Sequence, residues 1–182
     1  MTTVLTDPER ALFDGSAGAA VATRGHFRYE SGHHGDLWLD LDLLLIDARA
    51  VHGWSAALAQ QVAACRPEVV CGPLSGGAFV AQALAAALGA AFAFAERRLI
   101  EGSVAYRIPD GLRARVAGRR VVLADDAVNA GSALLATLAD ARRCGAELAG
   151  FASLITLGDA VATLAARHRV PFVHLIALGS SL

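Results

Sequence analysis

From residue 67 onward, short apolar runs alternate with helix-length segments, and this rhythm limits the possible folds more than any other feature. The runs that predict strands are "EVVCG", "AAFAFA", "RRVVLA", "LAGFASLITL" and "PFVHLIAL". The segments that predict helices are "GGAFVAQALAAALG", "GSALLATLADARRCG" and "GDAVATLAARH". Continuous apolar strands separated by helices indicate a parallel sheet that is covered on both faces. The predicted fold class is therefore α/β, with a parallel sheet flanked by helices.

The first 66 residues follow a different pattern. "TDPERALF" predicts a helix that begins near Asp7, because a capping residue and early acids precede the apolar positions. "HFRY" and "DLWLDLDLL" alternate partly and frame the turn "ESGHHG", which predicts two short strands. Asp47 is expected to cap a helix whose apolar face is formed by Val51, Trp54, Leu58, Ala59 and Val62. No second domain is evident, so we expect one domain over residues 1–182.

Composition excludes several classes of protein. Hydrophobic residues make up 55% of the 182 residues and charged residues 18%, which argues against disorder. The net charge of −1 argues against broad binding to nucleic acid or to an anionic membrane. All 16 basic residues are arginine, so no lysine is present to act as a base or a mobile cation.

Cysteine spacing and the apolar runs bear on the cellular location. Cys65, Cys71 and Cys144 stand singly, as expected of core residues in a reducing compartment. The run 78–95 has the length of a membrane span, but it is mostly alanine and Gly89 divides it into a helix and a strand. The first residues carry acids and lack a signal pattern. We therefore expect a cytoplasmic protein with no membrane attachment.

Ligands of parallel α/β sheets bind where strands end and helices begin. Three loops occupy such places: 72–77, 96–118 and 125–133. In the third loop a strand delivers Asp125 and Asp126, and a helix begins near Gly131, whose free N–H groups favour an anion such as phosphate. The acids would repel phosphate but suit the hydroxyls of an attached sugar, with Mg²⁺ sharing the charge. The pattern predicts a site for ribose 5-phosphate.

This loop resembles the phosphoribosyl-diphosphate motif of the type I phosphoribosyltransferases. The matching positions are Val121 to Leu123, Asp125, Asp126, Val128, Gly131 and Ser132. The resemblance implies that Asp125 and Asp126 are the catalytic pair that holds the ribose hydroxyls. It also implies that the 5-phosphate is bound by Asn129, Ala130, Gly131, Ser132 and Ala133. The family usually has threonines at 129 and 130 and a hydroxyl at 133, so this chain has exchanged some phosphate donors.

Two further segments are similar to the orotate phosphoribosyltransferases of that family. In "HFRYESGHHGDLWLDLDLLL" the matching residues are Phe27, Ser31, Gly32, Trp38 and Asp40. The resemblance implies a small N-terminal hood over about residues 1–45 and a core over 46–182. The implied base-binding residues are Phe27, Ser31, Gly32 and Trp38, with Trp38 covering a flat heterocycle.

The second of these segments is "CGPLSGGAFVAQALAAALGAAFAFAERR", in which a glycine-rich loop and a later arginine match the family's pyrophosphate site. The implied ligands of phosphoribosyl diphosphate are Ser75, Gly76, Gly77, Arg97 and Arg98. No protein ligand set for a metal is implied, since Mg²⁺ would bind mainly through the substrate.

The chain departs from the orotate pattern in the loop that follows Arg97. Orotate enzymes have a pattern resembling Arg-Lys-x-x-Lys-x-His-Gly; its second lysine falls on Glu101 and its histidine on Ser103. Glu30 stands where many relatives have lysine. Either a rearranged loop supplies the charge from Arg107, Arg113 or Arg115, or the protein is not a competent orotate enzyme.

Three functions therefore stay open. The first is a homodimeric phosphoribosyltransferase that joins orotate or a similar pyrimidine to ribose 5-phosphate. The second is a non-catalytic sensor of phosphoribosyl diphosphate or of a nucleotide, and the third is a transferase for a purine or another acceptor.

Overall fold

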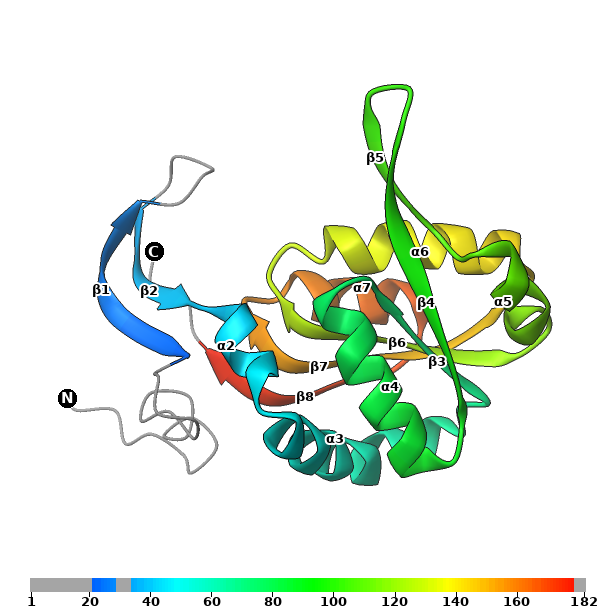
Figure 1. The fold of residues 1–182 in the computed structure, drawn as a ribbon, viewed down its shortest axis with the longest axis horizontal. Helices are drawn as coiled ribbons and strands as arrows, with labels where there is room; N and C mark the ends of the chain where they lie inside the picture. Colours follow the sequence, from blue (N-terminus) through cyan, green and yellow to red (C-terminus); the bar gives the residue numbers. More distant parts are fainter. Residues whose placement is uncertain (1–20, 29–33, 179–182) are drawn as a thin grey trace.

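A six-stranded sheet forms the centre of the molecule (Figure 1). The computed structural model of the 182-residue chain describes residues 21–28 and 34–178. The strand order is β5-β4-β3-β6-β7-β8, and every neighbouring pair is parallel except β4 and β5. The strands are β3 (Val69–Pro73), β4 (Ala91–Ile100), β5 (Ser103–Arg107), β6 (Arg120–Val128), β7 (Glu147–Leu157) and β8 (Phe172–Leu178).

Helices cover both faces of this sheet, as the alternating pattern predicts (Figure 1). One face carries α3 (Ala48–Val62) and α4 (Gly76–Leu88), with the short helix η1 (Ala63–Cys65) after α3. The other face carries α5 (Asp110–Val116), α6 (Ser132–Arg143) and α7 (Ala160–His168). Within the described ranges, no helix is long and apolar enough to cross a bilayer.

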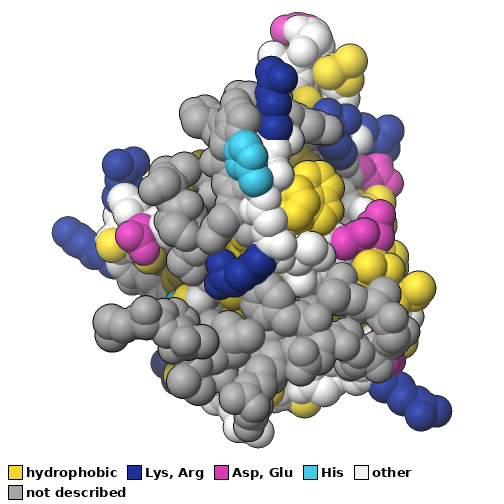
Figure 2. All heavy atoms as spheres, turned by 90° about the vertical axis from the view of Figure 1, so that its left-hand side faces the viewer, with side chains coloured by type: hydrophobic (Ala, Val, Ile, Leu, Met, Phe, Trp, Pro, Cys, Tyr) yellow, Lys and Arg dark blue, Asp and Glu magenta, His cyan; other side chains and the backbone are white. Residues whose placement is uncertain are grey.

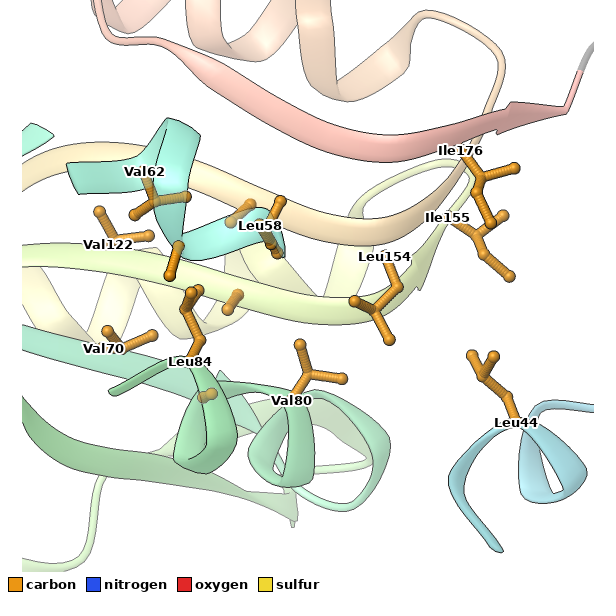
Figure 3. Close-up of a cluster of buried hydrophobic side chains, with 14 of the residues drawn as sticks. Leu44, Leu58, Val62, Val70, Val80, Leu84, Val122, Leu154, Ile155 and Ile176 are labelled. Atoms are coloured by element: carbon orange, nitrogen blue, oxygen red, sulfur yellow. The ribbon is translucent and has the colours of Figure 1, made fainter. Parts of the chain in front are cut away.

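Alternate residues of the buried strands divide between two cores. Val70 and Val122 lie with Leu58 and Leu84 in the core beneath α3 and α4 (Figure 3). The residues that precede them in β3 and β6 belong instead to the core beneath α5, α6 and α7. Since successive side chains of a strand point to opposite faces, an unbroken apolar strand can fill both cores at once. This explains why the buried stretches of β3 and β6 are apolar at consecutive positions.

The N-terminal hairpin packs beside the carboxyl ends of β7 and β8. It consists of β1 (Ala22–Arg28) and β2 (His34–Leu39), which pair antiparallel as predicted. Ala22 and Leu37 are buried in the same cluster as Ile176 and Leu178, near the end of β8. The helix predicted from Asp7 lies outside the described residues, as does Glu30.

The second predicted strand is shorter than expected. "DLWLDLDLL" alternates like a strand, but β2 ends at Leu39 and a helix, α2 (Leu41–Ile46), follows. Asp40 caps this helix, because its Oδ1 accepts a hydrogen bond from the Leu43 N–H at 3.2 Å. Burial of Leu44 in the core outweighs the local preference for a strand. The cap predicted at Asp47 is confirmed, since its Oδ1 accepts from Arg49 N at 2.9 Å and Ala50 N at 3.2 Å.

The interval 96–118 is not an open loop. β4 continues to Ile100 and turns back into β5, so that an antiparallel hairpin projects from the body (Figure 1). The turn is Glu101-Gly102, with φ values of 49° and 77°, and this left-handed geometry suits a two-residue hairpin turn. The predicted parallel sheet is confirmed for β3, β4, β6, β7 and β8, and β5 extends it at one edge as an antiparallel strand.

Candidate active site

Two adjacent carboxylates occupy the end of β6, next to the end of β3. Asp125 is 7% exposed and Asp126 is 8% exposed. The Asp126 N–H donates to Asp125 Oδ1 at 3.1 Å, and the Ala127 N–H donates to Asp126 Oδ1 at 2.8 Å. These bonds orient both side chains through one oxygen each. The second oxygen of each carboxylate is then positioned to accept a hydrogen bond from a ligand hydroxyl.

Burial raises the pKa of Asp125 well above its ordinary value, and the neighbouring charge of Asp126 raises it further. Two carboxylates in a confined space are each less stable when both are ionised. Hydroxyl groups or a cation would stabilise the charged pair. Two such charges side by side are unfavourable in the unliganded protein, which favours a role in binding over a role in folding.

The glycine-rich loop after β3 lies directly against these carboxylates. A Cβ atom at Gly76 would lie 2.1 Å from Asp126 Oδ2, and one at Gly77 would lie 2.5 Å from Asp125 Oδ1. The loop leads into the first turn of α4, and the preceding Leu74–Ser75 peptide bond is cis. The first N–H groups of a helix have no intrahelical partner and can bind an anion. Gly76, Gly77 and the exposed Ser75 thus face the same region as the acids.

A second helix begins on the other side of the acid pair. Gly131 precedes the 12-residue helix α6 with φ of 71°, a conformation that favours glycine. A Cβ at Gly131 would lie 2.8 Å from Val161 Cγ2, so the position also lacks room for a side chain. Ser132 is the first helical residue and is exposed, as are Asn129 and Ala130, and Ala133 is half-buried. The first N–H groups of α6 have no intrahelical partner, as a phosphate site at this turn would require.

The predicted arginines lie on β4, beyond the part of the strand that pairs with β3. Ala95 is the last paired residue, and at about 3.3 Å per residue Arg97 lies about 7 Å further on. Arg98 forms an ion pair with Glu96. Arg97 is exposed and makes no side-chain ion pair with the part of the chain that the structure describes. Arg97 is therefore the better placed of the two to pair with an added anion.

Two of the three arginines that could supply the charge missing from the orotate pattern are paired with Asp140. Arg107 Nη1 lies 2.7 Å from Asp140 Oδ1, and Arg113 Nη1 lies 3.0 Å from Asp140 Oδ2. Asp140 lies in the last part of α6, about 12 Å along the helix from Ser132. Arg115 lies on α5, which leads into the start of β6 at the opposite end from the acids. The Asp140 pairing joins segments 27 and 33 residues apart, and no local sequence pattern indicates it.

The described part of the predicted base site is a pair of aromatic residues on the N-terminal hairpin. The ring centroids of Phe27 and Trp38 are 5.9 Å apart at an angle of 38°, and Trp38 is 46% exposed. Figure 2 views the molecule from this side, and there exposed hydrophobic side chains lie among basic and acidic ones. An exposed indole beside a second ring can stack on a flat heterocycle. Ser31 and Gly32 lie outside the described residues.

The residues present suit a magnesium ion that is held mainly by a ligand. Within residues 21–28 and 34–178, no group of three or more histidine, cysteine or acidic side chains is arranged to hold a metal. Mg²⁺ is commonly held by one or two carboxylates together with phosphate oxygens of a substrate. Asp125 and Asp126 fit that role, beside two helix N-termini that suit phosphate.

These features define a class of protein. At the carboxyl ends of the strands of a parallel α/β sheet, two carboxylates lie near the N-termini of two helices, which are places that suit anions. This arrangement is expected of an enzyme for a phosphorylated sugar.

Comparison with known proteins agrees with this class. Residues 44–170 match the phosphoribosyl transferase domain, and the chain therefore belongs to the type I phosphoribosyltransferase family, a family of transferase enzymes. This chain is 29% identical over 142 residues to the orotate phosphoribosyltransferase of Wolinella succinogenes, and the match covers 77% of this chain and 67% of that protein. It is 31% identical over 137 residues to that of Nitratiruptor sp., covering 74% of this chain and 65% of the relative. The chain thus corresponds to about two thirds of each.

A solved structure shares the fold. The orotate phosphoribosyltransferase of Mycobacterium tuberculosis in complex with 5-phospho-α-D-ribosyl 1-diphosphate superposes with a TM-score of 0.65 at 22% identity, covering 86% of this chain and 88% of that one. The sequence-based predictions of the family and of its α/β fold are confirmed.

Proposed function

We propose that the protein transfers ribose 5-phosphate from phosphoribosyl diphosphate to a heterocyclic base, orotate or a similar pyrimidine, and releases pyrophosphate. The observation that carries this proposal is the direct contact of the Gly76-Gly77 loop with Asp125 and Asp126. The site would then have backbone N–H donors for an anion on each side of two carboxylates, which accept hydrogen bonds from hydroxyl groups. Phosphoribosyl diphosphate has the matching order of pyrophosphate, ribose diol and phosphate. The curated relatives in Wolinella and Nitratiruptor, named as orotate phosphoribosyltransferases, support the choice of base.

In this proposal the chain acts mainly by positioning charge. As pyrophosphate leaves, positive charge develops on the anomeric carbon, and groups fixed in advance stabilise it best. Asp125 and Asp126 accept hydrogen bonds from the two ribose hydroxyls. The start of α6, from Gly131 and Ser132 with Asn129, holds the 5-phosphate.

The leaving group and the base would be held by other elements. The start of α4 and Arg97 receive pyrophosphate, while Trp38 covers the base. Mg²⁺, when bound, would neutralise part of the pyrophosphate charge next to the acids. No lysine of this chain takes part, since it has none.

The direct test is an assay of pyrophosphate release. The protein is incubated with phosphoribosyl diphosphate, Mg²⁺ and a panel of bases that contains orotate, uracil, adenine, guanine and hypoxanthine. Release with orotate supports the full proposal, whereas release with a purine alone would reassign the acceptor. Silence with every base would refute transfer.

A second candidate is a sensor that binds phosphoribosyl diphosphate without turnover. The observation that favours it is the β4–β5 hairpin, in which Glu101 occupies the turn and Arg107 is engaged by Asp140. Glu101 stands where the orotate pattern has a lysine, and a carboxylate in place of that cation would repel pyrophosphate. Calorimetry separates the two: tight binding with no product from any base supports the sensor, and product formation excludes it.

A further inference from the structure

Asp140 is the most heavily bonded carboxylate in the described part of the chain, and the proposed chemistry does not use it. Its side chain is 1% exposed. It accepts hydrogen bonds from Arg107 Nη1 at 2.7 Å, Ile108 N at 2.8 Å and Arg113 Nη1 at 3.0 Å. Arg143 Nη1 lies 3.7 Å from its Oδ1. Burial alone would raise the pKa of Asp140, but these donors outweigh it and hold the pKa below its ordinary value.

The donors come from one place in the chain. Arg107 is the last residue of β5, Ile108 follows it, and Arg113 lies on α5. Beyond Ala95 the hairpin pairs only with itself, from Glu96 opposite Arg107 to Ile100 opposite Ser103. The returning strand is therefore fastened to α6 at its base by the Asp140 carboxylate, in addition to the apolar packing of Tyr106 and Ile108.

The attachment of the hairpin to α6 depends on the negative charge of Asp140. Arg107, Arg113 and Arg143 place three guanidinium groups around one carboxylate, so the cluster keeps a net positive charge even when Asp140 is ionised. Without that carboxylate the guanidinium groups would repel one another, and Arg107 would move outward. The hairpin that carries Arg97 would then lose its fixed place relative to α6, whose first turn forms the phosphate cradle.

We propose that Asp140 is a positioning residue that fastens the β4–β5 hairpin to α6 and so holds Arg97 in place for pyrophosphate. The part that concerns pyrophosphate rests on the proposed function; the fastening does not. Asp140 would act on the pyrophosphate half of the ligand and leave the ribose 5-phosphate half unaffected. Asp140 would affect the reaction only through its effect on the position of the hairpin.

Hydrogen exchange measured by mass spectrometry tests the fastening without any ligand. Asp140→Asn keeps the shape and an acceptor for Ile108 N–H, and Arg107→Ala removes only the hairpin's own bond. Both should speed exchange of the amides in residues 97–107 by about tenfold or more, the effect of one charged hydrogen bond, with α3 and α4 unchanged. The matched control is Arg143→Ala, which alters the same cluster from within α6 and should leave the hairpin protected.

Calorimetry with two ligands tests the positioning. In Asp140→Asn and Arg107→Ala the Kd for phosphoribosyl diphosphate should rise by about tenfold, whereas that for ribose 5-phosphate should stay within about twofold. Equal losses for both ligands, or an unchanged Kd with a freed hairpin, would overturn the positioning role. Unchanged hairpin exchange in both variants would overturn the fastening itself. If the wild type bound neither ligand, the proposed function would fail, and the exchange experiment would still decide the fastening.

Discussion

Among single residues, Gly76 and Gly77 shape the candidate site as much as the two acids do. Their missing side chains leave room for Asp126 Oδ2 and Asp125 Oδ1, which lie too close to the Cβ positions for any side chain to be present there. The backbone of the first turn of α4 can therefore approach a ligand that the acids hold. The sequence indicates an anion-binding loop at 72–77, but its contact with the acids depends on β3 and β6 being neighbours.

Gly76→Ala should weaken ligand binding. The new methyl group would displace the Asp126 carboxylate, so the Kd for phosphoribosyl diphosphate should rise by about tenfold or more, the loss of one charged hydrogen bond. Calorimetry measures this Kd. Gly53→Ala is the control, because no atom lies within 4 Å of its Cβ position in α3; it should leave affinity unchanged and stabilise the protein by up to about 1 kcal/mol. Wild-type affinity in Gly76→Ala would contradict the geometry.

Asp125→Asn should stabilise the unliganded protein at pH 7, and the gain should shrink as the pH falls. The folded pKa of Asp125 is raised, so between its unfolded value, about 4, and the folded value the native state binds more protons. Wild-type stability therefore increases on acidification through that window, while the neutral amide does not titrate. Melts of both proteins from pH 4 to pH 8 measure the difference. A gain that grows toward low pH would contradict this account.

At the scale of elements, the core was predictable and the edges were not. β3, β4, β6, β7 and β8, with the helices α4, α6 and α7, follow from apolar runs that glycine or proline interrupts. The sequence pattern predicts a strand where α2 lies, because six residues with alternating leucines carry too little local signal against the burial of Leu44. It predicts a loop where the β4–β5 hairpin lies, because the segment is rich in arginine, although Glu101-Gly102 is a typical hairpin turn.

Part of the candidate site is likewise predictable from the local sequence, and part of it is not. Asp125, Asp126 and the start of α6 follow from a strand–loop–helix pattern that is local in sequence. The use of Arg107 and Arg113 by Asp140 does not, because it depends on how α5 and α6 pack on one face of the sheet. Long-range charge pairing of this kind leaves no periodic signal in a single sequence.

Within α6, Thr137→Val should raise stability. Thr137 is fully buried, and its Oγ1 has no hydrogen-bond partner in the described part of the chain. Valine has the same shape without the unsatisfied hydroxyl, so the free energy of unfolding should rise by about 1–3 kcal/mol. Chemical denaturation measures the change. Thr163→Val on the exposed face of α7 is the control and should change stability by less than about 0.5 kcal/mol. A destabilised Thr137→Val variant would show that the hydroxyl is bonded.

On the scale of the whole molecule, we predict a homodimer. The hairpin exposes apolar residues well away from the core: Leu99 is 72% exposed, and Val104, which pairs with it across the strands, is 49% exposed. Such a surface favours association with a second chain. Light scattering at micromolar concentration should give a molar mass of about twice 18.8 kDa. The double variant Leu99→Glu, Val104→Glu should have a lower molar mass, because its exposed apolar surface is replaced by charge. A wild type that stays at 18.8 kDa would contradict the dimer.

The account's central claim is that Asp125 and Asp126 hold the ribose of phosphoribosyl diphosphate. The most direct measurement is the thermal shift of the wild type, Asp125→Asn and Asp126→Asn, each with and without phosphoribosyl diphosphate and Mg²⁺. The account predicts that both variants melt no lower than the wild type when unliganded. It also predicts that they lose about 1.4 kcal/mol or more of the ligand-induced stabilisation, since binding weakens by about tenfold or more. Variants that melt lower than the wild type but keep its full ligand shift would contradict the claim and make the acids part of the scaffold.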